Sequence, residues 1–354
     1  MNFTDIFTTD AIAARWTEAA TNRDPYLGEV LFPADKKLGL DLSFLKGSKG
    51  LPVALMPSAF DAMPTFRDRG GFEITETNMP FYREGFKIKE KDRQEILKVQ
   101  ESNSKFARPV IAKIFNDADE LLEGAMVAAE VERMGLLFPQ NGHARITVAA
   151  NGVKYDYNYD PDGSWRSNNY FELTGTAKWD NPSTANPFAD VDNVKTAIRG
   201  RTGNTPAIAV MNSTTFNYFA AMTVVSNRYI ARAGVSMSYL TKAEIKRVLE
   251  DTAEIRILIY DKMYKDQNKV AHKFVPDGYV AMIPEGALGN SWYGTTPEEA
   301  DLMANGNAEV SIVNKGIAIT REVTTMPVNV NIYASQIVLP SYEGMDDVAL
   351  LKVV

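Results

Sequence analysis

The sequence contains no cysteine and only two histidines, and these shortages exclude several kinds of chemistry. Without cysteine the chain cannot form a disulfide framework, a zinc ribbon, a thiol nucleophile or an iron–sulfur site, and its absence fits folding in a reducing cytoplasm. His143 and His272 cannot build a multi-histidine metal site. A Ser-His-Asp triad would depend on one of them alone.

Long apolar runs are also missing. No run approaches the roughly 20 residues that span a bilayer, and the N-terminus lacks the basic start and apolar stretch of a signal peptide. The formal net charge of −7 argues against a surface that attracts nucleic acid or acidic lipid. We therefore expect a soluble intracellular protein with no membrane partner. With 354 residues, 45% of them hydrophobic, the chain can form about two globular domains.

Motifs of known enzymes are absent. Neither histidine lies in a Gly-x-Ser-x-Gly or His-Glu-x-x-His context, and the glycines of residues 199–204 lack the Lys-Ser/Thr of a phosphate loop. A calcium loop beginning at Asp156 fails, because Pro161 stands where glycine is needed and Ser167 where glutamate is needed. A polar strand face that runs into a turn explains its acidic residues better. We assign no catalytic, cofactor-binding or metal-binding residue and predict no enzyme.

The first 50 residues predict a short helix over 9–20 and then an extended arm. Glycine and proline are dense after residue 22, which favours an arm crossing a surface over a packed element. Apolar side chains along this stretch would then anchor on a neighbouring chain, although packing into the chain's own core is the alternative. These side chains are Phe3, Phe7, Trp16, Tyr26 and Phe32.

Residues 51–90 predict two strands around a glycine tip. The prolines of this stretch would interrupt a central strand, so we expect an exposed ribbon or sheet edge. At the tip, Arg67 and Arg69 precede Gly70 and Gly71. The arginines could bind carboxylates of a neighbour bidentately, whereas a solvated turn is the alternative.

The rest of the chain predicts an α+β protein. An apolar period of i, i+3, i+4 indicates a long helix over 108–135, in which Gly124 suggests the close approach of another backbone. Asn151-Gly152 predicts a tight hairpin within 144–160, and residues 160–187 look irregular. Further helices are expected over 190–199, 213–225 (capped by Ser213) and 242–251. Further strands are expected over 207–211, 254–260, 279–283, 310–312, 317–319, 328–332 and 337–339.

The order of these segments resembles the major capsid proteins of tailed bacteriophages, specifically the lambda-like major capsid protein E family. Residues 67–71 followed by Pro80-Phe81-Tyr82 resemble the family's extended loop and its return. Residues 175–180 with Asp190 resemble the stretch that leads into the axial domain, and residues 274–278 with 288–290 and 293–294 resemble a late segment of that domain. The resemblance implies a Hong Kong 97-type fold with five parts. They are an N-terminal arm (1–50), an extended loop (51–92), a peripheral domain with spine helix and hairpin (93–160), an axial domain (161–305), and returning peripheral strands with a C-terminal segment (306–354).

By the same resemblance, hexamers and pentamers would tile an icosahedral shell around a double-stranded DNA genome, assembled in the host bacterial cytoplasm. Contacts between subunits would involve the loop residues Arg67, Arg69, Gly70, Gly71, Phe81 and Tyr82 and the five apolar residues of the arm. No lysine lies between Lys49 and Lys87, so non-covalent clasping or a decoration protein is expected in place of a covalent crosslink.

Further partners implied are a separate scaffolding protein, a portal protein, and packaged DNA touched only loosely and non-specifically. Two alternatives remain open. One is an encapsulin-like cellular shell of the same fold, and the other is an α+β enzyme that hydrolyses or binds a small molecule.

Overall fold

The computed structural model describes residues 7–21, 23–39, 41–46, 73–90, 94, 107–150, 153–233, 241–302, 309–325 and 328–354. The chain divides into two compact units between which it passes several times. Unit 1 comprises residues 1–44, 76–132 and 289–341, and unit 2 comprises residues 45–75, 133–288 and 342–354. Each unit contains both helices and a sheet, so the α+β class is confirmed.

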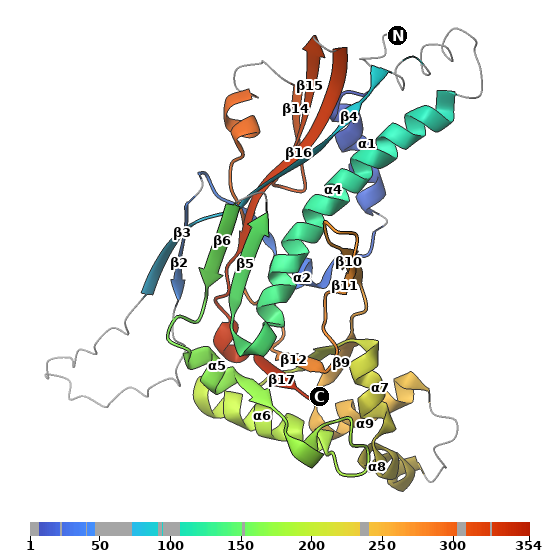
Figure 1. Cartoon of the computed structure of the whole chain (residues 1–354). Helices are drawn as coiled ribbons and strands as arrows, with labels where there is room; N and C mark the ends of the chain where they lie inside the picture. The colour runs from blue at the N-terminus through green and yellow to red at the C-terminus, as the bar shows by residue number, and fades with distance from the viewer. Residues whose placement is uncertain are drawn as a thin grey trace, which may run out of the picture. The chain divides into compact units, whose positions relative to one another are not determined.

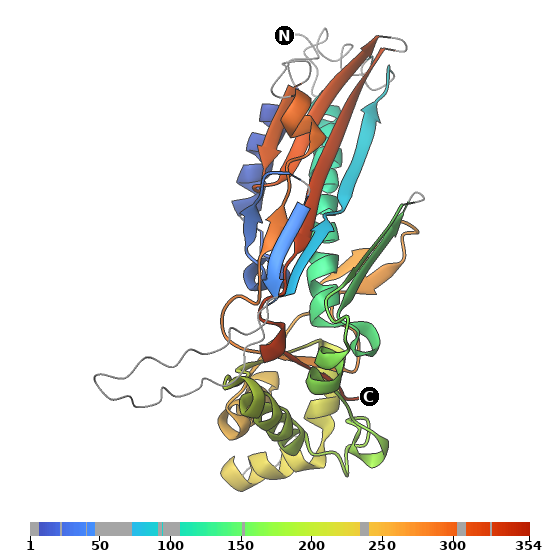
Figure 2. The same ribbon diagram turned by 90° about the vertical axis from the view of Figure 1, so that its left-hand side faces the viewer.

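Unit 1 is organised around one long strand of a six-stranded sheet. Strand β16 (Val328–Pro340) pairs antiparallel with three others, and β4 follows it in both ribbon views (Figures 1 and 2). It replaces the two strands that we expected over 328–332 and 337–339. The other strands of the sheet are β1 (Ala34–Lys36), β4 (Phe81–Ile88), β13 (Ser291–Tyr293), β14 (Glu309–Val313) and β15 (Ile317–Thr325).

Helices α1 (Thr9–Thr21) and α4 (Ala107–Leu137) cover one face of this sheet. The Ser311 hydroxyl contacts Thr9 of α1, and Gln336 Nε2 donates to Ala125 O of α4 at 2.6 Å. The strand register puts Ser311 and Gln336 on the same face. On the other face, the Ser335 hydroxyl donates to Glu298 of a short π-helix, Glu298–Leu302.

The expected long helix over 108–135 is confirmed as α4. Ile114, Ala118, Leu122 and Met126 form its buried stripe at a spacing of four residues. Gly124 lies between two stripe positions and is therefore turned to the exposed side, where a Cβ would meet nothing within 4 Å. The expectation that another backbone approaches Gly124 is wrong.

Unit 2 contains a five-stranded sheet with helices packed against one face. The strand order is β7-β17-β12-β8-β9, so the C-terminal strand lies between β7 and β12. Its strands are β7 (Tyr170–Glu172), β8 (Ile208–Met211), β9 (Arg256–Ile259), β12 (Tyr279–Ile283) and β17 (Ala349–Lys352). The helices that share its core are α6 (Pro187–Thr202), α7 (Ser213–Ala221), α8 (Thr223–Ala233) and α9 (Lys242–Ala253).

Two local expectations for unit 2 are wrong. The predicted helix over 213–225 is two helices, because Met222 is extended between α7 and α8, and the cap is Asn212, whose Oδ1 accepts from Thr215 N at 2.8 Å. Residues 160–187 are not irregular throughout, since they contain α5 (Ser164–Asn169) and β7. The Asp160 carboxylate starts α5 by accepting from Trp165 N and Arg166 N, at 2.9 and 3.0 Å.

Three two-stranded ribbons complete the described structure. The predicted hairpin is confirmed as β5 (Arg145–Ala150) and β6 (Val153–Asn158), in which hydrogen bonding to Arg145 lowers the pKa of Asp156. The other ribbons are β2 (Asp41–Lys46) with β3 (Glu73–Asn78) and β10 (Met263–Lys265) with β11 (Ala271–Lys273). Short helical segments are α2 (Leu27–Leu31), Gln140–Gly142, Gly175–Ala177 and Met345–Asp347.

The unit boundaries differ from the expected domains at the hairpin, at the C-terminal strand and at residues 289–305, which we expected in the axial domain but which belong to unit 1. The β5–β6 hairpin and the C-terminal strand both belong to unit 2, whereas we expected the hairpin in the peripheral domain. Helix α4 carries the chain from unit 1 into unit 2 between Glu132 and Arg133. Within the described ranges, none of the helices combines the length and the apolarity that crossing a membrane demands.

Asp190 is a half-buried carboxylate in the first turn of α6. Trp179, whose side chain is 1% exposed, donates from Nε1 to Asp190 Oδ2 at 2.9 Å. Burial raises the pKa of Asp190 above its ordinary value, and the hydrogen bond from Trp179 opposes this shift in part. Folding therefore favours the protonated carboxyl. The contribution of Asp190 to the free energy of unfolding is complete below the ordinary pKa of aspartate. It is lost as the pH rises through the raised pKa of the folded state.

We predict that Asp190→Asn removes this loss of stability at higher pH. The amide keeps an acceptor for Trp179 and cannot ionise, so the variant should gain free energy of unfolding relative to the wild type between about pH 4 and about pH 7. Urea unfolding at both pH values measures the difference. Asp192→Asn, at an exposed position of the same helix, is the control and should follow the wild type. A relative stability of Asp190→Asn that stays constant or falls with pH would contradict the prediction.

Candidate assembly surfaces

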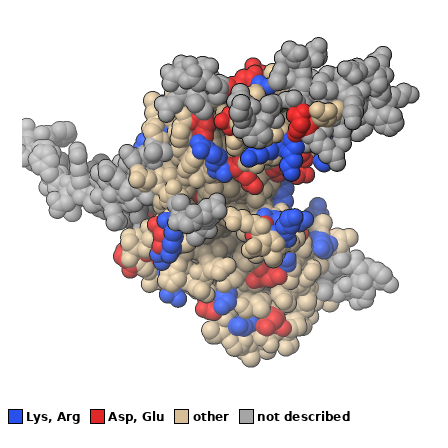
Figure 3. Space-filling view, turned by 45° about the horizontal axis from the view of Figure 1, so that its top comes forward, with Lys and Arg blue, Asp and Glu red and all other residues tan. Residues whose placement is uncertain are grey.

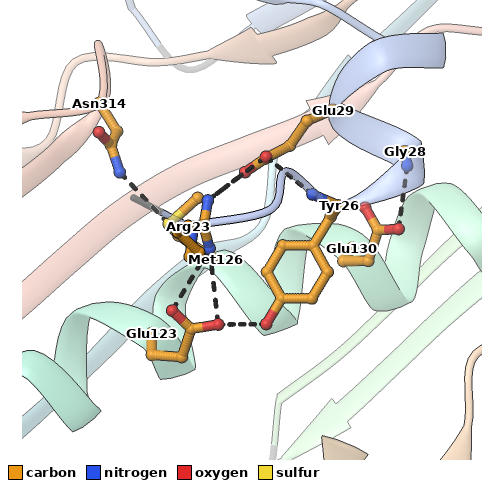
Figure 4. A network of polar contacts seen from close by, with 8 residues as sticks. All are labelled: Arg23, Tyr26, Gly28, Glu29, Glu123, Met126, Glu130 and Asn314. Atoms are coloured by element: carbon orange, nitrogen blue, oxygen red, sulfur yellow. Dashed lines mark hydrogen bonds and ion pairs between the residues drawn. The ribbon is translucent and has the colours of Figure 1, made fainter. Parts of the chain in front are cut away.

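The N-terminal segment is held on α4 by acidic side chains of that helix. Glu123 accepts from Arg23 Nη1 at 3.3 Å and from the Tyr26 hydroxyl, and Glu130 Oε1 accepts from Gly28 N at 2.9 Å (Figure 4). Arg23 also binds Glu29, so that one guanidinium joins α2 to α4. Burial, and then the hydrogen bond to Glu123, raise the pKa of the Tyr26 hydroxyl, which stays protonated as a donor.

A second contact lies one turn before Glu123 on α4. Arg15 of α1 binds Asp119 at 3.0 Å and Asn116 at 2.7 Å, and its guanidinium lies over the Phe115 ring at 5.2 Å. Asp119, Glu123 and Glu130 are spaced by four and seven residues and so share one side of the helix. The first part of the chain is therefore seated along α4 by a row of charged hydrogen bonds.

The arm residues that we expected on a neighbouring subunit are buried within their own chain. Their exposed fractions are 1% for Phe7, 4% for Trp16, 7% for Tyr26 and 0% for Phe32. This corrects the expectation that these side chains anchor the arm on a neighbour, and the alternative that they join the chain's own core is the one observed. The physical reason is that residues 27–36, despite their breakers, form α2 and the strand β1, which pairs with β13. Phe3 lies outside the described residues.

The extended loop is described only where its chain returns. Arg67, Arg69, Gly70 and Gly71 lie outside the described residues, and their role remains a prediction. Phe81 and Tyr82 are half-buried at the start of β4, opposite Ile337 and Gln336 of β16. The Tyr82 hydroxyl donates to Glu132 of α4. These two residues therefore belong to the sheet of unit 1 and not to the loop tip.

The buried carboxylate of Glu298, which the sequence pattern did not single out, holds β4 on the face of the sheet that is turned away from α4. Glu298 is 4% exposed and accepts hydrogen bonds from Arg83 of β4 and from the Ser335 hydroxyl of β16, the latter at 2.9 Å. Arg83 also lies over the Phe81 ring at 4.9 Å. Since Arg83 and Glu298 are 215 positions apart, no local pattern could have paired them.

Gly85 occupies the point where β4 crosses an aromatic ring of β16. A Cβ at this position would collide with the Tyr333 ring and would lie 2.7 Å from the Ile332 carbonyl oxygen. The ring is fixed there, because the Tyr333 hydroxyl donates to Glu322 at 3.1 Å. Glycine is thus needed for β4 to pair closely with β16.

The two histidines, and the charges on one face of the molecule, form no evident site for catalysis or for a polyanion among the described residues. His143 is exposed after a short turn, and His272 binds Asp266 at 3.0 Å within the β10–β11 hairpin. Among the described residues, no group of histidine and acidic side chains could hold a metal ion. On the face drawn in Figure 3, basic and acidic side chains are interspersed, with no stripe of one sign.

Comparison with known families decides what this arrangement is. The sequence pattern of the family described as phage major capsid protein E matches residues 8–349. The chain belongs to this family. Members of the phage major capsid protein E family are structural shell proteins and not enzymes. No match is found among curated protein sequences.

Solved structures share the fold at low sequence identity. A prophage protein of Escherichia coli CFT073 that is described as a capsid protein is 11% identical, with a TM-score of 0.62, over 98% of this chain and 99% of that chain. A phage-related protein of Bordetella bronchiseptica RB50 is 14% identical, with a TM-score of 0.55, over 98% and 96%. The capsid of cyanophage A-1(L) is 11% identical, with a TM-score of 0.50, over 93% and 92%. The fold of this phage major capsid protein E family member is therefore the Hong Kong 97-type capsid fold.

Two glycine substitutions in unit 1 should have opposite effects. Gly85→Ala should lower the free energy of unfolding by about 1–3 kcal/mol, because the methyl group forces the Tyr333 ring or the β16 backbone to move. Gly124→Ala should raise it by about 0.5–1 kcal/mol, because the site is open and alanine favours a helix. Denaturant unfolding of the unassembled chain measures both changes. Equal effects of the two substitutions would show that the contact of Gly85 does not matter.

Proposed function

We propose that this capsid protein assembles as hexamers and pentamers into an icosahedral shell that encloses the double-stranded DNA genome of a tailed phage. The family match over residues 8–349 carries the proposal. It is supported by the presence of a complete sheet in each unit, since a subunit with its own cores can be added to a shell as a folded block.

The residues between β2 and β3 would clasp a neighbouring subunit. This part of the chain carries Arg67 and Arg69, whose planar guanidinium groups bind carboxylates bidentately. The contact of Arg83 with buried Glu298 supports this role, because it fixes the strand through which the chain returns. No lysine lies between Lys49 and Lys87, so the clasp would be non-covalent or would be supplemented by a decoration protein.

The N-terminal segment would contact neighbours through different side chains from those first expected. Its aromatic residues are buried, but Val30 is 60% exposed and Leu38 is 87% exposed. Both are apolar side chains that would lose contact with water against a second subunit. They are the candidates for the arm's share of the interface.

The remaining partners are those that membership of the family suggests. We propose that scaffolding is supplied by a separate protein and that a portal protein completes the shell. The net charge of −7 favours loose, non-specific contact with packaged DNA. Assembly in the host cytoplasm fits the absence of cysteine.

An encapsulin-like shell is the second candidate, because shells of both kinds can be built on one fold. The contents of the particle discriminate between them. A phage shell made in infected cells should contain DNA, whereas a cellular compartment should contain a cargo protein bound through a short peptide.

We predict that the wild-type chain, co-expressed with its neighbouring genes, forms closed particles. Sedimentation velocity should show a fast fraction, and negative-stain microscopy of that fraction should show closed shells tens of nanometres across. The chain expressed alone is the control for dependence on a scaffold. A stable monomer under all conditions, with the neighbouring genes present, would contradict the proposal.

The loop tip can be tested separately with Arg67→Ala combined with Arg69→Ala. Loss of both guanidinium groups should lower the yield of closed particles and their resistance to heat, because a bidentate contact with a neighbour is lost. Arg166→Ala with Arg199→Ala, at exposed positions of unit 2, removes the same charge and is the matched control. Particles of unchanged yield and heat resistance in the tip variant would show that Arg67 and Arg69 do not clasp a neighbour.

A further inference from the structure

The β10–β11 hairpin, residues 261–273, extends from the five-stranded sheet of unit 2 as a separate two-stranded ribbon (Figures 1 and 2). Within the described chain these two strands pair only with each other. A hairpin of this kind is marginally stable by itself in water. Its stability must therefore come from contacts along its length and at its root.

A ladder of rings stiffens the ribbon. Tyr264 lies opposite His272 with ring centroids 5.4 Å apart, and the Tyr264 ring lies 5.0 Å from that of Phe274. Phe274 is 5% exposed and contacts Tyr260, so the ladder continues into the core of unit 2. At the tip, Asp266 accepts from Asn268 N and Val270 N, at 2.9 and 2.8 Å, and binds His272.

Both ends of the hairpin are tied to the N-terminus of helix α7. Asp261 accepts from Ser213 N at 2.8 Å, and Asp277 accepts from Asn212 Nδ2 at 2.6 Å. Lys273 Nζ joins the second contact by binding Asp277 at 2.7 Å. A ribbon fixed at its root, its middle and its tip loses little conformational entropy when it docks.

The outer surface of the ribbon is apolar and basic. Met263 is 53% exposed and Val270 is 52% exposed, although both are large apolar side chains. The hairpin contains four lysines against two aspartates, in a chain whose net charge is −7. Its formal charge is thus opposite in sign to that of the whole chain, and Lys265 and Lys269 are on the exposed side of its turn.

We propose that the β10–β11 hairpin docks on an acidic surface of a second copy of this chain. The inference rests on the proposed shell, in which every subunit meets identical copies that carry excess negative charge. A basic ribbon reduces the repulsion between such copies and fixes their register. The exposed Met263 and Val270 favour a protein surface over a phosphate backbone, since only a protein surface offers apolar groups for them to cover.

Charge reversal tests the docking in the full chain under the co-expression conditions described above. Lys265→Glu with Lys269→Glu should lower the fraction of chain in particles by about tenfold or more, because attraction becomes repulsion. Lys154→Glu with Lys242→Glu, at exposed positions elsewhere in unit 2, changes the net charge equally and should leave the fraction unchanged. Met263→Ser with Val270→Ser should also lower it. Near-ultraviolet circular dichroism of each unassembled variant confirms that the chain has folded.

Carbodiimide crosslinking of wild-type particles gives a second measurement. Mass spectrometry should find Lys265 or Lys269 joined to an aspartate or glutamate of another subunit. The inference would be overturned if both hairpin variants assembled as well as the wild type does. It would also be overturned if the control variant lost as large a fraction of its particles as the hairpin variants. Normal assembly with a reduced DNA content would overturn it in favour of nucleic-acid contact. Failure of the wild type itself to assemble would overturn the proposed shell, and the two failures are thereby distinguished.

Discussion

The structure of unit 1 depends on how the carboxylates on the inner side of helix α4 are satisfied. A carboxylate withdrawn from water is costly unless hydrogen-bond donors replace the lost water. Glu130 is buried and Asp119 and Glu123 are half-buried, and all three receive donors from residues 15–28, which lie 100–104 positions away in the sequence. The N-terminal segment therefore has to fold onto α4, and its aromatic side chains are drawn into the core together with it.

The six-stranded sheet of unit 1 explains how a long connection can leave this unit without weakening its packing. Strand β16 holds β4 over eight paired positions, and Arg83 reaches from β4 to Glu298 on the opposite face of the sheet from α4. Gly85 allows β4 to lie close against the Tyr333 ring. The chain that precedes β4 thus returns to a fixed strand. The proposed loop therefore has a rigid base, and how far it extends depends on the sheet of unit 1 as well as on the loop itself.

Much of the fold could be predicted from local patterns. The period of α4, the pairing of β5 with β6 and the alternation in β14 to β16 could be predicted from neighbouring residues, and these elements are all present in the structure. Two errors and one omission have a common cause. The environment of Gly124, the burial of the arm aromatics and the pairing of Arg83 with Glu298 are decided by residues far away in the sequence. One signal was present, since Glu130 lies on the apolar stripe of α4 and so required a buried partner. For the loop tip the local pattern left a clasp and a solvated turn open, because two arginines beside two glycines are typical of many surface turns, and the family resemblance favoured the clasp.

The burial of the aromatic residues of the N-terminal segment within their own subunit has a consequence for assembly. Side chains buried within the subunit cannot also supply contact area between subunits, so in the proposed shell the described residues would contribute isolated exposed apolar groups, such as Leu38 and Met263, together with charges. Single contacts of this kind are weak and reversible. A closed shell needs that property, because a misplaced subunit must be able to leave before the shell closes around it. Stability then comes from the number of contacts that each subunit makes at once, as in any multivalent assembly.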